Sequence, residues 1–189
     1  VGAPPSRQAG VGVPPSRQAG VGVPPSRQAG GERTAPLAGL VAAFIFAAQM
    51  LNFPVASGTS GHLLGGALAA ILVGPYTGVL CISVVLLVQG LLFADGGLTA
   101  LGINITLMAV VGVPVAYGVF SALVRVLPRK RVSVTAASFL AAFISVPAAA
   151  AAFTVLYALG GVTEVPLGQV AGAMIGIHLI IGIGEGAIT

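Results

Sequence analysis

Charged side chains are scarce in this sequence: 6% of its 189 residues are Asp, Glu, Lys or Arg, whereas 57% are hydrophobic. A soluble globular domain carries roughly a quarter charged residues, so the composition excludes that class. The eight basic residues are also too sparse to form a nucleic-acid-binding surface. The chain therefore requires a lipid bilayer as its solvent.

Cysteine is almost absent as well. Cys81 is the only one, which excludes an internal disulfide bond, and it lies inside an apolar run. Free cysteine is among the most buried residue types and behaves as a small hydrophobic group. We expect Cys81 to be a buried, small apolar residue without a chemical role.

Several motifs that carry a defined chemistry are missing. The chain has no GxxxxGK[ST] phosphate loop, so it does not hydrolyse ATP by that route. It has no HExxH, no CxxC and no nucleophile elbow, which leaves an enzymatic function with little support. It also lacks paired halves with interrupted helices, the pattern of many transporters that work alone. These absences disfavour both an enzyme and a self-sufficient transporter.

Three tandem decapeptides open the chain: VGAPPSRQAG, followed twice by VGVPPSRQAG. Each pairs two prolines with Ser, Arg, Gln and Gly, a composition that cannot bury an apolar face. We expect residues 1–32 to form an extended, disordered tail. No charged start precedes an apolar core here, so the tail is not a signal peptide. A genuine tail and a mis-assigned start of the reading frame both fit.

Long apolar runs follow after Arg33. They favour helices, because a chain in lipid must satisfy its own backbone hydrogen bonds, and a β-barrel would show alternating polarity instead. We predict an all-α integral membrane domain over 33–189, a bundle of about six transmembrane helices. The predicted helices are 35–53, 62–74, 76–94, 104–127, 132–159 and 167–189.

The segment 62–74 is the shortest of these. Thirteen helical residues rise about 20 Å, less than the roughly 30 Å of the bilayer core, so the segment either crosses a thin region or enters without crossing. Basic residues mark the N-terminal tail and the loop 128–132 as cytoplasmic. Both can lie inside only if an even number of spans separates them. This parity makes 62–74 a crossing.

With that topology, polar side chains gather at the outer face, where a captured solute first meets the protein. Helix ends are always more polar than helix centres, but the inner face carries few polar residues other than basic ones. The asymmetry between the faces favours a function for the outer group. Its members are Asn52, Thr59, Ser60, His62, Gln89, Asp95, Asn104, Glu164 and Gln169.

His62 is the candidate metal ligand in this group. It is predicted to open a helix directly after the glycine-bracketed loop 57–61. A neutral imidazole suits Co²⁺, Ni²⁺, Cu²⁺ and Zn²⁺, whereas Mg²⁺ and Ca²⁺ prefer oxygen ligands. Two other interpretations fit: a helix-capping loop with Thr59 or Ser60 as the cap, and a histidine at the water interface.

Two ionisable residues, His178 and Glu185, lie within the last predicted helix. They are seven positions apart and therefore share a face. Such groups usually face the bundle interior and serve a function. A proton or ion relay and a buried structural hydrogen-bond pair both fit. The structural pair is favoured slightly, because a relay normally needs more groups.

Four long segments of the chain resemble the CbiM/NikM family, the substrate-specificity subunits of energy-coupling-factor cobalt and nickel transporters. They match in order and without gaps, and the resemblance covers about 33–189. GTSGHLLGG and FADGGLTALG are its most specific parts. The segments are AAFIFAAQMLNFPV (42–55), GTSGHLLGGALAAILVGPYTGVL (58–80), LLVQGLLFADGGLTALGINI (86–105) and HLIIGIGEGAIT (178–189).

The resemblance implies an ATP-driven importer that captures Co²⁺ or Ni²⁺ outside the cell and could feed cobalamin biosynthesis. It implies as partners a transmembrane coupling subunit, ABC-type ATPases and a small accessory membrane subunit. The metal is cargo, and no permanently bound cofactor is implied. The family's motif histidine matches His62, which makes His62 the main metal ligand. Around it we expect Thr59, Ser60, Asp95 and Asn104, with His178 and Glu185 as an intramembrane polar pair.

The beginning of the chain departs from the family. Family members start with a Met-His-Ile-Pro-Asp-Gly-like segment, whose terminal amine and histidine help to bind the metal, and then a further helix. The proline repeats stand in that place here, so we expect this chain to lack both. The alternative to metal capture is therefore a truncated, degenerate membrane protein that keeps the bundle but no longer binds metal. An intramembrane enzyme or channel built on His178 and Glu185 is disfavoured.

Overall fold

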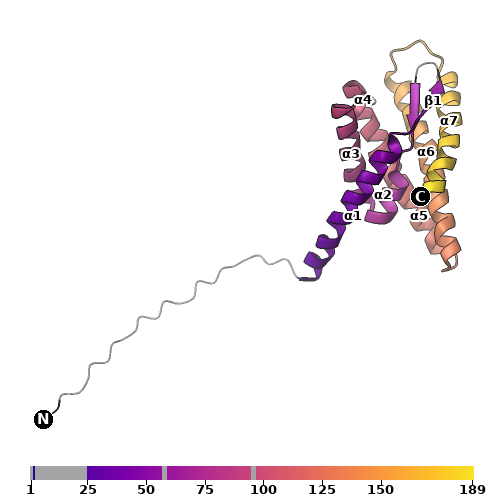
Figure 1. Cartoon of the computed structure of the whole chain (residues 1–189). Coiled ribbons are helices and arrows are strands. Elements are labelled where there is room, and N and C mark those ends of the chain that lie inside the picture. Colours follow the sequence, from indigo (N-terminus) through magenta and orange to yellow (C-terminus); the bar gives the residue numbers. More distant parts are fainter. Residues whose placement is uncertain (1, 3–24, 57–58, 95–96) are drawn as a thin grey trace.

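The computed structural model describes residues 2, 25–56, 59–94 and 97–189, with side chains for residues 2, 34–51, 61–94 and 97–189. These residues form a helical bundle with a small β-hairpin at one end (Figure 1). The predicted all-α membrane fold is confirmed. In chain order the elements are α1 (Pro25–Gln49), β1 (Asn52–Ala56), β2 (Thr59–His62), α2 (Gly66–Val73), α3 (Pro75–Leu92), α4 (Gly97–Asn104), the π-helical η1 (Ile105–Gly112), α5 (Val113–Val126), α6 (Arg131–Gly160) and α7 (Leu167–Ile188).

Four helical stretches of the described chain are long and apolar enough to cross a membrane. They are α3, the continuous run of α4, η1 and α5, then α6 and α7. They correspond to the helices predicted at 76–94, 104–127, 132–159 and 167–189. The predicted span 35–53 corresponds to the shorter apolar part of α1, Thr34–Gln49, and 62–74 contains the eight-residue α2. The predicted disordered tail lies outside the described residues, apart from Gly2 and residues 25–32, which are helical and belong to α1.

The helix predicted to run to residue 53 ends at Gln49. A proline disfavours helical backbone at the preceding residue and clashes with the carbonyl four residues earlier, so Pro54 ends the helix before it. The chain then forms an antiparallel hairpin in which Asn52 pairs with His62 and Phe53 pairs with Gly61. This hairpin differs from the prediction, in which every element of the membrane domain is a helix.

The segment 62–74 also differs from its prediction. His62 ends β2 instead of opening a helix, and α2 begins only at Gly66. The physical reason is Gly65, whose φ of 72° is left-handed and cannot continue a right-handed helix. The passage away from the hairpin therefore begins with a segment, 63–65, that is neither strand nor helix, and continues as α2.

Close helix packing holds this short passage in the bundle. A Cβ at Gly78 of α3 would lie 3.2 Å from backbone atoms of Ala69 and Ala70 in α2, so the two helices approach to backbone contact. Cys81, one turn further along α3, is buried and its thiol donates to the Ala38 carbonyl of α1 at 3.6 Å. The expectation of a buried, small residue at Cys81 is confirmed.

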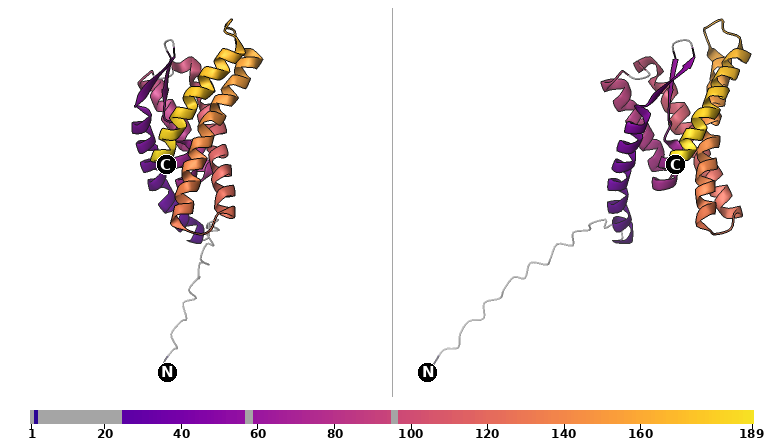
Figure 2. Two further views of the ribbon diagram at one scale, coloured as in Figure 1. Left: turned by 90° about the vertical axis from the view of Figure 1, so that its right-hand side faces the viewer. Right: turned by 45° about the vertical axis from the view of Figure 1, so that its right-hand side comes forward.

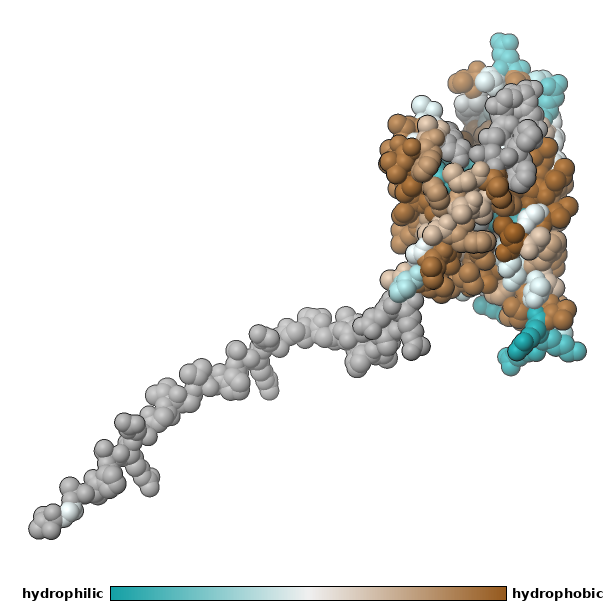
Figure 3. Space-filling model, in the orientation of Figure 1, coloured by the Kyte–Doolittle hydropathy of each residue, from teal (hydrophilic) through white to brown (hydrophobic). Residues whose placement is uncertain are grey.

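The hydropathy of the surface differs between the sides and the ends of the bundle. Apolar residues dominate the described sides of the bundle, and hydrophilic residues gather at its two ends (Figure 3). The hairpin and the α6–α7 connection lie at one end, and the α5–α6 connection lies at the other (Figure 1). α7 packs along α6 and also meets β1 (Figure 2). The hairpin, the non-helical segment 63–65 and α7 therefore lie together, and the candidate site is formed by residues of these elements.

Candidate functional site

His62 is the last residue of β2 and directly precedes the non-helical segment 63–65. Its ring is half-buried, and Nδ1 lies 2.9 Å from the carbonyl oxygen of Leu63. A carbonyl only accepts, so Nδ1 is the donor in this hydrogen bond, and in a neutral ring the lone pair is then on Nε2. Metal-binding histidines characteristically donate their second ring nitrogen in this way, which fixes the ring. His62 is therefore in the tautomer that ligates through Nε2.

His178 lies near the middle of α7 and is also half-buried. Its Nδ1 donates to the Met174 carbonyl one turn earlier, at 2.6 Å, which again leaves the lone pair on Nε2. α7 packs against β1, and β1 Asn52 pairs with His62 in the hairpin. The structure thus places the elements that carry the two imidazoles, from opposite halves of the sequence, beside each other.

Glu185 is only 1% exposed, and its carboxylate spans two backbone amides. Leu64 N–H donates to Oε2 at 2.9 Å and Gly65 N–H donates to Oε1 at 2.6 Å. The expected pair with His178 is wrong as a hydrogen bond, because each residue bonds backbone groups elsewhere. Glu185 instead accepts hydrogen bonds from the non-helical segment 63–65, which lies more than a hundred residues earlier in the chain.

The backbone of residues 63–65 explains why a carboxylate lies so deep in the bundle. These residues lie outside a helix, so their backbone N–H groups need partners from elsewhere in the protein, because lipid offers none. Glu185 accepts the two N–H groups, and Gln49 Nε2 donates to the Leu64 carbonyl at 2.7 Å. Gln49 is fully buried. The two side chains together complete the backbone hydrogen bonding of residues 64 and 65.

Gln49 was not among the predicted site residues, although the sequence contains a signal for it. It is the one polar side chain in the apolar run 35–51, where an amide requires a partner. Glu185 was selected, but its partners could not be read from the sequence. Backbone amides carry no residue-specific signal, and the break in the helix at 63–65 was not anticipated.

The remaining predicted polar residues divide into three groups. Thr59, Ser60 and Asn52 belong to the hairpin, but their side chains lie outside the described residues, as does the whole of Asp95. Gln89 is buried within α3, and Asn104 is half-buried at the end of α4. Glu164 and Gln169 are exposed at the α6–α7 connection and the start of α7. Of the predicted set, the hairpin–α7 region unites His62, His178 and Glu185.

No group of three or more His, Cys, Asp or Glu side chains able to hold a metal ion occurs in the described part of the chain. Each Glu185 oxygen accepts one backbone N–H, and the Nε2 atoms of His62 and His178 make no hydrogen bond within the described part of the chain. Two imidazoles suit a late transition metal better than a hard cation such as Mg²⁺. The assignment of His62 as a metal ligand stays a prediction.

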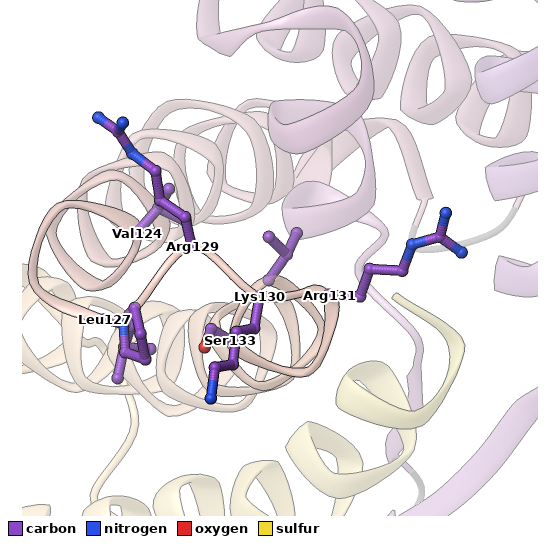
Figure 4. A pocket seen from close by; sticks show the side chains of 8 residues that line it. Val124, Leu127, Arg129, Lys130, Arg131 and Ser133 are labelled. Atoms are coloured by element: carbon purple, nitrogen blue, oxygen red, sulfur yellow. The ribbon is translucent and has the colours of Figure 1, made fainter.

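A cavity lies at the opposite end of the bundle, between α5 and α6. It measures about 270 Å³, and its lining includes Arg129, Lys130 and Arg131, whose side chains point away from one another (Figure 4). Its position at a helix connection, below long apolar helices, is typical of the positive charges that flank a membrane span. It is remote from the histidines, so we do not assign it to the same site.

Comparison with known proteins places these features in a family. The family model described as cobalt uptake substrate-specific transmembrane region, CbiM, matches residues 19–189. Two crystal structures, of a transition metal transporter and of a truncated form of one, each have a TM-score of 0.74 and 28% identity. The truncated form is covered over 81% of its length and covers 86% of this chain.

Curated relatives agree with the family model. A putative fused nickel transport protein NikMN of Archaeoglobus fulgidus is 44% identical over 159 residues, which are 84% of this chain and 52% of that protein. A putative metal transport protein of Haloquadratum walsbyi is 42% identical, over 85% of this chain and 70% of its own length. The cobalt transport protein CbiM of Sorangium cellulosum is 37% identical, over 82% and 69%. The chain spans about half the length of the fused nickel protein.

Proposed function

The chain belongs to the CbiM family of cobalt-uptake substrate-specific transmembrane regions, and from this we propose that it captures Co²⁺ or Ni²⁺ for import. The observation that carries the proposal is the tautomer and position of His62. Its Nδ1 is held by the Leu63 carbonyl, so Nε2 is presented for a metal at the base of the hairpin, beside the helix α7 that carries His178. The cation is cargo, bound and then released.

Capture takes place outside the cell in this proposal. The tail and the loop 128–132 carry the basic residues, which are retained on the cytoplasmic side of membranes. The hairpin and His62 lie at the end of the bundle opposite that loop (Figure 1). The metal thus meets His62 from the outer face.

Two exposed valines test this orientation. Val162 is 96% exposed in the α6–α7 connection and Val132 is 79% exposed at the start of α6. In a Cys81→Ala background, we expect a membrane-impermeant maleimide to label Val162→Cys in intact cells and Val132→Cys only after permeabilisation. The reverse pattern would place His62 inside and contradict the proposed direction of capture.

Partners are part of the proposal as well. The chain has no phosphate loop, so ATP-driven uptake requires ATPases of the ABC type and a membrane coupling subunit, with a small accessory subunit in some assemblies. Such a complex could supply cobalt to cobalamin biosynthesis. The cation-binding step belongs to this chain and can be measured without the other subunits.

Competition between cations tests the proposed cargo. We expect Co²⁺ and Ni²⁺ to bind the detergent-purified chain, as measured by isothermal titration calorimetry, and to displace each other. Mg²⁺ in large excess should not displace them, because imidazole is a poor ligand for Mg²⁺. If Co²⁺ does not bind, or if Mg²⁺ competes equally, the chain does not capture a transition metal through imidazole.

A further inference from the structure

Three side chains distant in the sequence, Glu185, Gln49 and Ile45, contact the non-helical segment 63–65. The Glu185 carboxylate accepts two consecutive N–H groups, and Gln49 donates to the carbonyl between them. Ile45 packs directly against Gly65, where an added Cβ would lie 2.5 Å from Ile45 Cγ2. This arrangement fixes the path of the segment rather than only shielding it from lipid.

A carboxylate is required at Glu185 because two donors converge on it. Each of its oxygens accepts one N–H, at 2.9 and 2.6 Å. A glutamine has nearly the same shape but only one accepting oxygen, and its NH₂ group would face the second N–H donor to donor. Glu185→Gln therefore breaks one of the two bonds with little change in volume.

The position of Glu185 is itself set by the close approach of α7 to α6. A Cβ at Gly182 would lie 3.0 Å from the Phe143 carbonyl oxygen, and one at Gly186 would lie 2.7 Å from the Phe139 ring. These glycines flank Glu185 and let α7 dock on α6 at backbone distance. The same helix carries His178, so one rigid element holds both the carboxylate and the second imidazole.

We propose that Glu185 and Gln49 are positioning residues for cation capture, a role that rests on the proposed function. His62 donates to the carbonyl of Leu63, the first residue of the non-helical segment 63–65. Glu185 and Gln49 form hydrogen bonds with the backbone of the next two residues. The direction of Nε2 thus depends on a segment whose path these side chains determine. Neither side chain contacts the cation.

The test compares Glu185→Gln and Gln49→Leu with the wild-type chain in detergent. We expect each to weaken Co²⁺ binding by about tenfold to hundredfold, the range found when groups that orient metal ligands are lost. The visible absorption of bound Co²⁺ should change, because the ligand geometry relaxes. In a His62→Ala background, Glu185→Gln should have no further effect on binding.

A matched variant separates positioning from general stability. Val146→Ala removes buried volume from α6 but none of the hydrogen bonds that Glu185 and Gln49 make to residues 64 and 65. It should lower the unfolding temperature and leave Co²⁺ affinity unchanged. If Glu185→Gln lowers stability in the same way but leaves affinity and the Co²⁺ spectrum unchanged, the residue is only structural and the proposal is wrong.

A second readout does not depend on metal. Loss of the Glu185 bonds should speed hydrogen exchange of the Leu64 and Gly65 amides and increase the reactivity of His62 toward diethyl pyrocarbonate. If the wild-type chain binds no Co²⁺, the proposed function fails while these two measurements still report whether Glu185 positions His62. Unchanged exchange and reactivity in Glu185→Gln would overturn the positioning role.

Discussion

A Gly65→Ala variant will unfold at a markedly lower temperature than the wild-type chain. The left-handed φ of 72° costs an L-residue about 1–2 kcal/mol. The new methyl group would also lie 2.5 Å from Ile45 Cγ2 in a packed region, and such overpacking typically costs about 1–3 kcal/mol. Together we expect a loss of roughly 2–5 kcal/mol. A thiol-reactive fluorophore that detects the buried Cys81 on unfolding measures the transition.

Substitutions at two other glycines distinguish the backbone cost from the overpacking cost. Gly74 has φ 82° and ψ 165°, a backbone region that is essentially restricted to glycine, but open space around an added Cβ, so Gly74→Ala should show a backbone cost without overpacking. Gly118, within α5, has neither feature, and Gly118→Ala should leave stability unchanged or slightly raised. In Gly65→Ala combined with Ile45→Ala, the total loss should be smaller than the sum of the single losses. Gly65→Ala as stable as Gly118→Ala would contradict the observed backbone path.

His62→Ala will have the largest effect on metal binding. Removing the imidazole that supplies Nε2 deletes a ligand, so we expect Co²⁺ and Ni²⁺ affinity to fall by more than roughly a hundredfold, beyond the effect of an orienting group. The fold should persist, because the ring is only half-buried and its hydrogen bond is to the next residue. Isothermal titration calorimetry gives the affinity and circular dichroism checks the fold.

His178→Ala is the companion variant. It lies on α7, which packs against the hairpin that carries His62, and we expect a smaller loss of affinity than for His62→Ala. Equal affinity of the wild-type and His62→Ala chains would rule out His62 as a ligand. A larger loss in His178→Ala would transfer the main role to α7.

The long helices could be predicted from the sequence because apolar length is a local property. The runs that became α3, α6 and α7 are each bounded by Gly or Pro and need no tertiary information. The parity of basic residues predicts that 62–74 crosses the membrane, and this stays a prediction, because the segment is not among the four long apolar helical stretches of the described chain. Composition therefore determines the long helices.

The hairpin and the non-helical segment 63–65 could not be predicted from apolar length. Residues 62–74 are apolar enough for a helix, and the left-handed Gly65 is one of several glycines in that stretch. What stabilises the break is distant: Glu185 lies 120 residues after Gly65. A buried acid signals that a partner exists, but it does not say that the partner is backbone.

The candidate site was predicted only in part for the same reason. His62 was identified from its residue type and the loop before it, whereas the proximity of His178 follows from the packing of α7 beside the hairpin. Glu164 and Gln169 were grouped with the site by their position at the outer face, yet they are exposed at the α6–α7 connection. Depth in the membrane did not distinguish the two sets of polar residues.

The most direct test of metal capture is X-ray absorption at the cobalt edge of the Co²⁺-loaded chain, compared with His62→Ala at the same protein and metal concentrations. We predict imidazole scattering in the wild-type spectrum and its loss or marked reduction in the variant. A wild-type spectrum with only oxygen ligands, or one that His62→Ala leaves unchanged, would contradict cation capture by His62.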